Sequence, residues 1–383
     1  MSNKVPQIRF NGYSDAWEER KLKDVTERVR SNDGRMDLPT LTMSASSGWL
    51  DQKDRFSGDI SGQEKKNYTL LKKGELSYNH GNSKLAKYGV VFSLTNYEEA
   101  LVPRVYHSFK ALENTSADFI EYMFSTKIPD RELGKLVSSG ARMDGLLNIN
   151  YDDFMNIHIS IPNYEEQILM SDFFRKLDDT IALHQRKLDL LKEQKKGFLQ
   201  KMFPKNGAKV PELRFAGFTD DWEERKFKDI LKTYSFRSYL ANASDNGKYE
   251  VIQQGDNPIV GYSDGIPFMN YKDIILFGDH TVSLYKPHSP FFISTDGVKI
   301  LSADNFEGIY LYTTLERYKP DSQGYKRHFT ILKNQELWFT RNMEEQQKVG
   351  LFFKQLDNNI TLQQKKLSLL KDQKKGLLQK MFI

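Results

Sequence analysis

A segment of 39 residues occurs twice in this chain and constrains its fold more than any other feature. The first copy spans residues 165–203, the second spans residues 344–382, and 24 of the 39 positions are identical at a constant offset of 179. In each copy, apolar residues recur at alternating steps of three and four, which is the spacing of a coiled-coil seam. The sequence therefore predicts two long helices that pair along one face.

Two seam positions in each copy are not apolar, and they are the same two. His184 is matched by Gln363, and Lys195 is matched by Lys374. A polar seam residue lowers stability but disfavours slipped packing, so we interpret these positions as determinants of register. A metal or catalytic role for His184 is the alternative, and the glutamine in the second copy disfavours it. The predicted seam, without the two lysines, comprises Phe174, Leu177, Ile181, His184, Leu188, Leu191, Phe198, Met202, Phe353, Leu356, Ile360, Gln363, Leu367, Leu370, Leu377 and Met381.

Both predicted helices open with the same start signal. Asn163 precedes Glu166 by three residues, and Asn342 precedes Glu345 by three. This spacing is typical of a capping box, in which the first side chain accepts a backbone N–H and the glutamate reaches back to the cap. We therefore expect both helices to begin next to these asparagines.

A shorter repeat precedes each variable region. Residues 5–25 recur as residues 210–230, 205 positions later, with 13 of 21 positions identical. The chain thus consists of a short repeat, a variable region and a long helix, followed by the same three parts again. The identical frames predict that both halves perform one mechanical task. The two variable regions show no convincing alignment, which predicts that each half contacts something different. Trp17 and Trp222 lie in the short repeats, where buried aromatic anchors are favoured over a binding role.

The repeats divide the chain into two globular parts and two helices. We predict a first domain at 1–162, a long helix at 163–203, a linker at 204–209, a second domain at 210–341 and a long helix at 342–383. Both globular parts carry mixed α/β patterns. The predicted strands are 89–94, 157–161, 297–301 and 308–312, the predicted helix is 117–125, and the predicted loops are 72–84, 138–154, 253–265 and 323–328.

Composition limits the class of protein and its compartment. The 383 residues carry a formal net charge of +5 and no cysteine. Residues 186–201 hold six basic residues against two acidic ones, and residues 365–380 hold six against one. Such runs are either solvated helix faces or contacts to a nucleic-acid backbone or an acidic partner. The chain has no apolar run of about 18 residues and no segment resembling a signal peptide, so we expect a cytoplasmic protein without a membrane span.

The sequence has no recognisable catalytic motif. The nearest match to a base-flipping methyltransferase tetrad, Asn257 to Val260, lacks the aromatic residue on which a base would stack. No phosphate-binding G-x-x-x-x-G-K-[ST] loop is present, and no two histidines have the H-x-x-x-H spacing. We therefore expect no catalytic residue, no metal site and no cofactor in this chain.

The duplicated frame resembles the specificity subunit of type I restriction-modification systems. The resemblance lies in the two repeats, in E-E-Q at the start of each long helix, and in Q-K-K-G-x-L-Q-K-M-F at its end. The segment before the first helix, which includes residues 139–142, Ile149 and residues 157–162, is also similar to that family. The resemblance implies two α/β target-recognition domains in tandem, held apart by two long antiparallel coiled-coil helices that give the chain an internal pseudo-two-fold repeat.

The resemblance also implies a function and a set of partners. Each domain would read one half of a bipartite site in double-stranded DNA, and the helices would set the spacer and dock two methylation subunits. Those subunits would supply adenine methylation with S-adenosylmethionine, and restriction subunits would add ATP- and Mg-dependent translocation and cleavage. The alternative is a non-catalytic coiled-coil adaptor that joins protein partners without binding DNA.

Candidate DNA contacts follow from side-chain chemistry. Arginine suits guanine edges, asparagine and glutamine suit adenine edges, and lysine or arginine also grips phosphates. The predicted contacts in the polar loops are Asn79, His80, Asn82, Lys84, Arg104 and Arg142 in the first domain, and Gln253, Gln254, Lys299, Tyr325, Lys326 and Arg327 in the second.

Overall fold

The computed structural model describes residues 5–56, 62–137, 146–205, 207–324 and 326–383. The chain divides into two compact units, of which the first comprises Met1–Leu183 with Leu367–Ile383 and the second comprises His184–Lys366. Each unit contains one globular domain and a part of both long helices. Both domains combine sheets with short helices, so the mixed α/β prediction is confirmed.

The first domain is built around a four-stranded antiparallel sheet in the order β2-β9-β6-β7. Strand β1 pairs with β10, β3 with β4, and β5 with β8, all antiparallel. The elements are β1 (Glu18–Lys21), β2 (Thr26–Arg28), β3 (Leu41–Ser44), β4 (Gly48–Asp51), α1 (Gln52–Phe56), β5 (Thr69–Lys72), β6 (Leu76–Asn79), β7 (Val90–Ser93), β8 (Glu99–Val102), β9 (His107–Ala111), α2 (Ala117–Ser125), α3 (Asp130–Leu136), α4 (Tyr151–Met155) and β10 (His158–Ile161), with 3-10 turns at Leu22–Asp24 and Gly62–Asn67.

The second domain contains the same kind of sheet, in the order β12-β18-β15-β16, again antiparallel throughout. Strand β11 pairs with β19, as β1 does with β10, whereas β13 pairs with β14 and in parallel with β17. The elements are β11 (Glu223–Lys226), α6 (Phe227–Ile230), β12 (Leu231–Tyr234), β13 (Tyr249–Ile252), β14 (Ile259–Ser263), β15 (Ile275–Gly278), β16 (Leu284–Tyr285), β17 (Phe291–Ile293), β18 (Val298–Ala303), α7 (Gly308–Tyr318), α8 (His328–Asn334) and β19 (Glu336–Phe339), with a 3-10 turn at Arg237–Tyr239.

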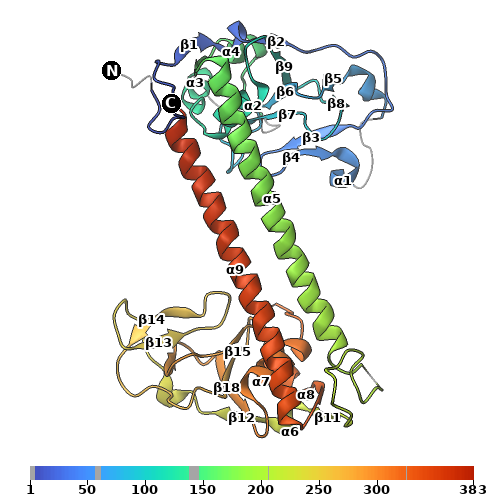
Figure 1. The fold of residues 1–383 in the computed structure, drawn as a ribbon, viewed down its shortest axis with the longest axis vertical. Helices are drawn as coiled ribbons and strands as arrows, with labels where there is room; N and C mark the ends of the chain where they lie inside the picture. The colour runs from blue at the N-terminus through green and yellow to red at the C-terminus, as the bar shows by residue number, and fades with distance from the viewer. Residues whose placement is uncertain (1–4, 57–61, 138–145, 206, 325) are drawn as a thin grey trace. The chain divides into compact units, whose positions relative to one another are not determined.

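The two repeated segments form the long helices α5 (Tyr164–Lys201) and α9 (Met343–Met381), drawn in green and red in Figure 1. Within each unit they are antiparallel: the rings of Phe174 and Phe382 lie 6.0 Å apart in the first unit, and those of Phe198 and Phe352 lie 5.1 Å apart in the second. Every residue of the predicted seam is buried or half-buried. The period of the apolar residues therefore predicted the buried face of each helix.

The polar seam residues bind each other or nearby carboxylates. Gln363 Nε2 lies 2.6 Å from His184 Nδ1 and 3.0 Å from the His184 carbonyl oxygen, so equivalent residues of the two copies meet directly. Lys195 Nζ lies 2.6 Å from an oxygen of Asp357. Lys374 Nζ lies 2.5 Å from Asp178, which is the residue equivalent to Asp357. These short polar contacts support a role in register, because a slipped pairing would leave half-buried charges without partners.

A buried ion pair ties each short repeat to the start of a long helix. Arg9 binds Glu166 through Nε at 2.7 Å and Nη2 at 2.8 Å, and Arg214 binds Glu345 at 2.7 and 2.9 Å. The two glutamate side chains are 0% and 1% exposed. The capping prediction is therefore half right: Asn163 accepts the Glu166 N–H at 2.9 Å, but the glutamate turns to an arginine instead of back to the cap.

The glutamine after each of these glutamates fixes the start of a second helix. Gln167 Oε1 accepts the Ser116 N–H at 2.9 Å in front of α2, and Gln346 Oε1 accepts the Glu307 N–H at 2.8 Å in front of α7. The E-E-Q motif thus joins three segments that are far apart in the sequence. Arg341 is an additional residue before α9, yet Gln346 still donates to the Thr340 carbonyl as Gln167 does to that of Pro162.

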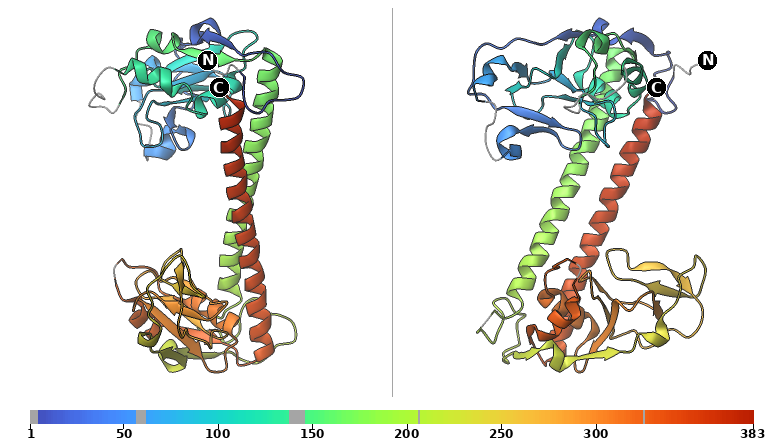
Figure 2. Two further views of the ribbon diagram at one scale, coloured as in Figure 1. Left: turned by 90° about the vertical axis from the view of Figure 1, so that its left-hand side faces the viewer. Right: turned by 180° about the vertical axis from the view of Figure 1, so that it is seen from behind.

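The end of each long helix packs into a domain core beside a tryptophan. In the first unit Trp17 meets Phe382 with ring centroids 6.1 Å apart, and the red end of α9 lies against this domain in Figure 2. In the second unit Trp222 meets Phe203 at 5.5 Å. The tryptophans are 2% and 3% exposed, which confirms that they are buried anchors.

Several local predictions were wrong. Residues 308–312 begin helix α7, because the Glu307 side chain accepts the N–H groups of Ile309 and Tyr310 and so caps a helix where a short apolar run indicated a strand. Strands β6 and β14 lie inside predicted loops, and helix α4 overlaps the end of the predicted loop 138–154, of which residues 138–145 are outside the described residues. The two variable regions, which do not align in sequence, nevertheless share a four-stranded central sheet of the same kind.

Candidate nucleic-acid interface

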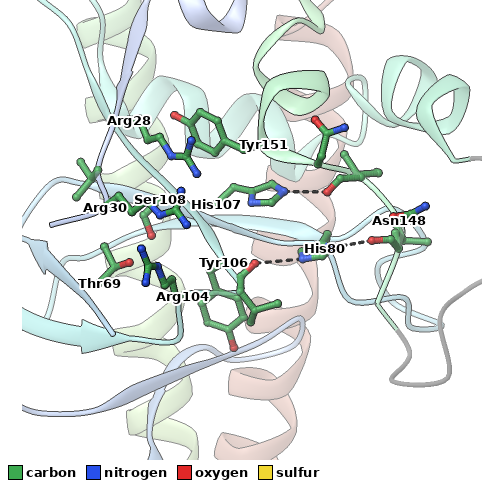
Figure 3. A pocket seen from close by; sticks show the side chains of 15 residues that line it. Arg28, Arg30, Thr69, His80, Arg104, Tyr106, His107, Ser108, Asn148 and Tyr151 are labelled. Atoms are coloured by element: carbon green, nitrogen blue, oxygen red, sulfur yellow. Dashed lines mark hydrogen bonds between the residues drawn. The ribbon is translucent and has the colours of Figure 1, made fainter. Parts of the chain in front are cut away.

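A cavity of ≈ 340 Å³ opens beside the central sheet of the first domain. Strands β2 and β9, the turn before β9 and the segment leading into α4 form its walls (Figure 3). Its polar lining residues are Arg28, Arg30, Thr69, His80, Arg104, Tyr106, His107, Ser108, Asn148, Asn150 and Tyr151, and no aspartate or glutamate is among them.

Three exposed arginines give this cavity a positive charge. Arg28 ends β2, Arg30 follows it, and Arg104 lies in the turn before β9. Among the described residues, none of the three forms an ion pair with a carboxylate. Arg28 differs from the other two because its guanidinium lies 4.0 Å from the centre of the Tyr151 ring, so a cation–π contact orients it. Figure 3 shows the two side chains next to each other.

His107 contributes a neutral group to the same wall. Its Nε2 lies 2.9 Å from the Ile149 carbonyl oxygen, and its ring stacks on His80 at 5.0 Å. The pKa of His107 is lowered to about 4, chiefly by burial and to a smaller extent by the nearby His80 and Arg28, while the hydrogen bond to Ile149 works in the opposite direction. At neutral pH the ring is therefore uncharged and its Nε2–H donates to the carbonyl, which leaves Nδ1 as a hydrogen-bond acceptor.

The second domain has a cavity of ≈ 460 Å³ at the corresponding place. The strand registers establish the correspondence. Tyr78 faces His107 across β6 and β9, and Phe277 faces Lys299 across β15 and β18. Along the other edge of β9 and β18, Arg28 of β2 faces Phe109, and Thr233 of β12 faces Leu301.

The equivalent positions carry different chemistry. By register, Arg28, Arg30 and His107 of the first cavity correspond to Thr233, Ser235 and Lys299 of the second. Phe329, near the start of α8, lines the second cavity as Tyr151, at the start of α4, lines the first. The cations of the second cavity are Lys299 and Arg327, which come from other elements. Lys299 donates to the Asp296 carbonyl oxygen at 2.7 Å and lies 3.5 Å from Asp279, whereas exposed Arg327 has no ion-pair partner among the described residues.

The structure separates the candidates predicted in the first domain. Arg104 lines the cavity that it shares with Arg28 and Arg30, the arginine cavity, while Asn79, Asn82 and Lys84 line another cavity of ≈ 430 Å³ in the same domain. His80 is 4% exposed, and its ring nitrogens lie 2.6 Å from the Leu147 oxygen and 3.1 Å from the Val105 oxygen. The prediction that His80 contacts DNA is therefore replaced by a role in supporting the wall. Arg142 lies outside the described residues.

In the second domain, Lys299 and Arg327 lie together and the other candidates do not join them. Gln253 Nε2 donates to the Asn257 carbonyl oxygen at 3.0 Å, and Gln254 Oε1 accepts the His280 N–H at 2.9 Å, so both glutamines stabilise local backbone. Exposed Lys326 donates to Gln323 at 3.1 Å. Tyr325 lies outside the described residues.

Sequence reasoning missed Arg28, Arg30, His107 and Tyr151. A signal for the first two was present, because the alternation in residues 26–30 (TERVR) places two arginines on one face of an extended segment. His107 and Tyr151 gave no such signal, since only the pairing of β9 and the position of α4 bring them to the cavity.

Two further properties limit the chemistry of the described residues. No group of three or more histidine, aspartate or glutamate side chains in the described ranges could hold a metal ion. In the same ranges, no helix is both long and apolar enough to cross a membrane: α5 and α9 have the length but carry too much charge.

Known proteins share this fold and its sequence pattern. The S subunit of a type I restriction-modification system from M. genitalium superposes with a TM-score of 0.66 at 14% identity, covering 99% of both chains. A structure from a study of complex assembly and conformational transition of the type I R-M system gives a TM-score of 0.51 at 15% identity, covering 96% of this chain and 97% of the other. At these identities the likeness shows the fold.

Sequence comparison gives one match to a relative over about a third of this chain and one match to a family over most of it. The specificity subunit of the type I restriction enzyme MjaVIII from Methanocaldococcus jannaschii is 23% identical over 126 residues, which span 32% of this chain and only 29% of that relative. The family described as type I restriction modification DNA specificity domain matches residues 14–193 and 219–372. Because these matches cover most of the 383 residues, the chain belongs to that family.

Proposed function

We propose that this chain is the DNA sequence-specificity subunit of a type I restriction-modification complex, in which each domain reads one half of a bipartite site. One observation carries the proposal: a frame built twice from the same residues presents two cavities at the same place with different side chains. A protein that reads two different half-sites with one architecture requires this combination.

The chemistry of the first cavity favours DNA over the rival function of a protein adaptor. Three arginines without carboxylate partners among the described residues suit phosphates and guanine edges, which accept hydrogen bonds. An adaptor that avoids nucleic acid has no need of such a cavity, because unpaired cations also attract DNA non-specifically.

The long helices are the proposed docking sites of two methylation subunits. Leu183 and Leu190 on α5 are 65% and 54% exposed, and the equivalent Leu362 and Leu369 on α9 are each 58% exposed. Leucines seven residues apart lie in one stripe of a helix, so each helix offers the same apolar stripe to a partner helix. The partner subunits would supply the catalysis and bind S-adenosylmethionine, ATP and Mg, while this chain would remain a non-catalytic cytoplasmic subunit.

The test is selection of DNA by the assembled complex. The chain and its methylation subunit would be purified together, incubated with random duplex DNA at fixed salt concentration, and the bound fraction sequenced. We expect enrichment of two short sequences separated by a spacer of constant length. Absence of DNA affinity even with the methylation subunit present would refute the proposal and favour the adaptor.

Helix length provides a second test, since we propose that the helices set the spacer. Deleting the equivalent heptads 181–187 and 360–366 removes about 10 Å of each helix, or about three base pairs of spacer. The selected sites should keep both half-sites and lose spacer length. An unchanged spacer would show that something other than the helices fixes it.

A further inference from the structure

We infer that the arginine cavity, and not the neighbouring cavity lined by Asn79, Asn82 and Lys84, is the base-reading site of the first domain. Arg28 is the residue that determines its specificity. This inference rests on the proposed function. It assigns a chemical role to residues that alignment of the two variable regions did not indicate.

The internal repeat decides between the two cavities. The arginine cavity has a counterpart at the same strand register in the second domain. The cavity of Asn79, Asn82 and Lys84 follows the end of β6, and the position equivalent to Asn79 is Gly278. There the side chains of Thr281, Ser283 and Gln254 approach within 2.4 to 2.8 Å of where a Cβ would lie, so the space is filled. A site used by both domains should be open in both.

Arg28 is the arginine whose geometry suits a base. Its guanidinium lies over the Tyr151 ring, whose position at the start of α4 is set by the Asn150 side chain, which accepts the Asp153 N–H at 2.8 Å. An oriented planar fork can donate two parallel hydrogen bonds to O6 and N7 of guanine in the major groove. Ordering the fork before DNA arrives lowers the entropy cost of that contact.

The other two arginines of the cavity have a different role. Arg30 and Arg104 are exposed, and no ring or carboxylate orients them among the described residues, which suits them to phosphates at variable distance. The second domain has Thr233 at the position of Arg28 and therefore lacks this guanine reader. Its cation without an ion-pair partner, Arg327, lies at the start of α8 instead, so the two half-sites are read from different walls of equivalent cavities.

The experiment compares half-site preferences selected by the complex from random duplex DNA. For Arg28→Ala we expect a loss of about 10- to 100-fold in preference for guanine at one position of the first half-site, with the second half-site unchanged. Arg28→Lys keeps the charge but not the planar fork, so the same position should remain relaxed. Unchanged preferences at the other positions of the first half-site show that the first domain of the variant is folded.

Matched variants make the result specific. Lys110→Ala removes an exposed cation from the same strand β9, where it pairs with Glu27 at 3.1 Å outside the cavity, and should leave both half-sites unchanged. Arg327→Ala should relax the second half-site alone. Asn82→Ala and Lys84→Ala alter the neighbouring cavity and should leave the first half-site unchanged.

The outcomes separate this inference from the proposed function. If the wild-type complex selects no two-part sequence, the proposed function fails. If it does, and Arg28→Ala weakens binding to every sequence equally while Arg28→Lys restores it, Arg28 is a phosphate contact and the inference is overturned. Relaxation of the first half-site by Asn82→Ala or Lys84→Ala, with Arg28→Ala silent, would assign base reading to the other cavity.

Discussion

The two domains keep the same residues where they build the frame and different residues where they face a ligand. Arg9–Glu166 and Gln167 recur as Arg214–Glu345 and Gln346. At the arginine cavity, by contrast, every compared position changes its side chain. A sheet that tolerates such changes without losing its strand order is specified by its buried faces and its frame, so its rim is free to vary.

The two domains can also be compared at the cavities beside their short repeats. Cavities beside the short repeats retain matching residues, with Arg20 and Arg225 at one position and Asp24 and Asp229 at another. Asn114 and Asn305 occupy equivalent places before α2 and α7, with positive φ angles of 63° and 61°, a conformation that asparagine tolerates better than most residues. The sites beside the short repeats therefore keep the same residues in both domains, whereas the cavities beside the central sheets do not.

Breaking the buried ion pair should change the stability of each domain more than any other substitution considered. Glu166→Gln leaves Arg9 buried without its carboxylate, and we expect the first domain to lose about 3–5 kcal/mol of stability. Glu345→Gln should cost the second domain a similar amount. Hydrogen exchange of α2 and α7 measures each domain separately, and the exposed Glu18→Gln is the control. A large loss in one domain and none in the other would show that the two frames are not energetically equivalent.

A pH dependence should distinguish the first domain from the second. The folded-state pKa of His107 is about 4, below the value of about 6.5 in an unfolded chain, so its contribution to stability is complete above pH 6.5 and is lost as the pH falls toward 4. At pH 5 the loss is about 2 kcal/mol.

The measurement is the urea-unfolding midpoint of the first domain at pH 7 and pH 5. His107→Gln should reduce the difference between the two pH values, whatever its effect at pH 7. The second domain has a lysine at this position and should show no change in its pH response in the variant. An equal pH difference in variant and wild type would mean that His107 is not the group responsible.

The smallest expected effect is at the helix caps. Asn163→Ala removes one acceptor of a backbone N–H, and Asn342→Ala removes an acceptor of two, at 3.0 and 3.2 Å. Each should cost about 1 kcal/mol, visible as faster hydrogen exchange in the first turn of α5 or α9. Should Asn163→Ala prove costlier than Asn342→Ala, the number of hydrogen bonds would not be what sets cap strength here.

The sequence by itself determined the frame. The apolar period of the repeats identified the buried face of α5 and α9, because a helix seam is encoded by residues three and four positions apart. The repeated asparagines marked where the helices begin, and the repeated tryptophans were recognised as buried anchors. Each of these inferences depends on local spacing or on internal identity, both of which are visible in one chain.

The tertiary structure decided what the variable regions share and where their functional residues meet. Register across three strands equates His107 with Lys299, which nothing in the sequence aligns, and it pairs Arg28 with Thr233 at the same offset of 205 as the short repeats. The tertiary structure also buries His80. In it the Glu166 side chain binds Arg9, more than 150 positions away in the chain, instead of the cap of its own helix. Sheet pairing and buried charge are non-local interactions, so their outcome depends on which segments meet and not on the spacing of residues along the chain.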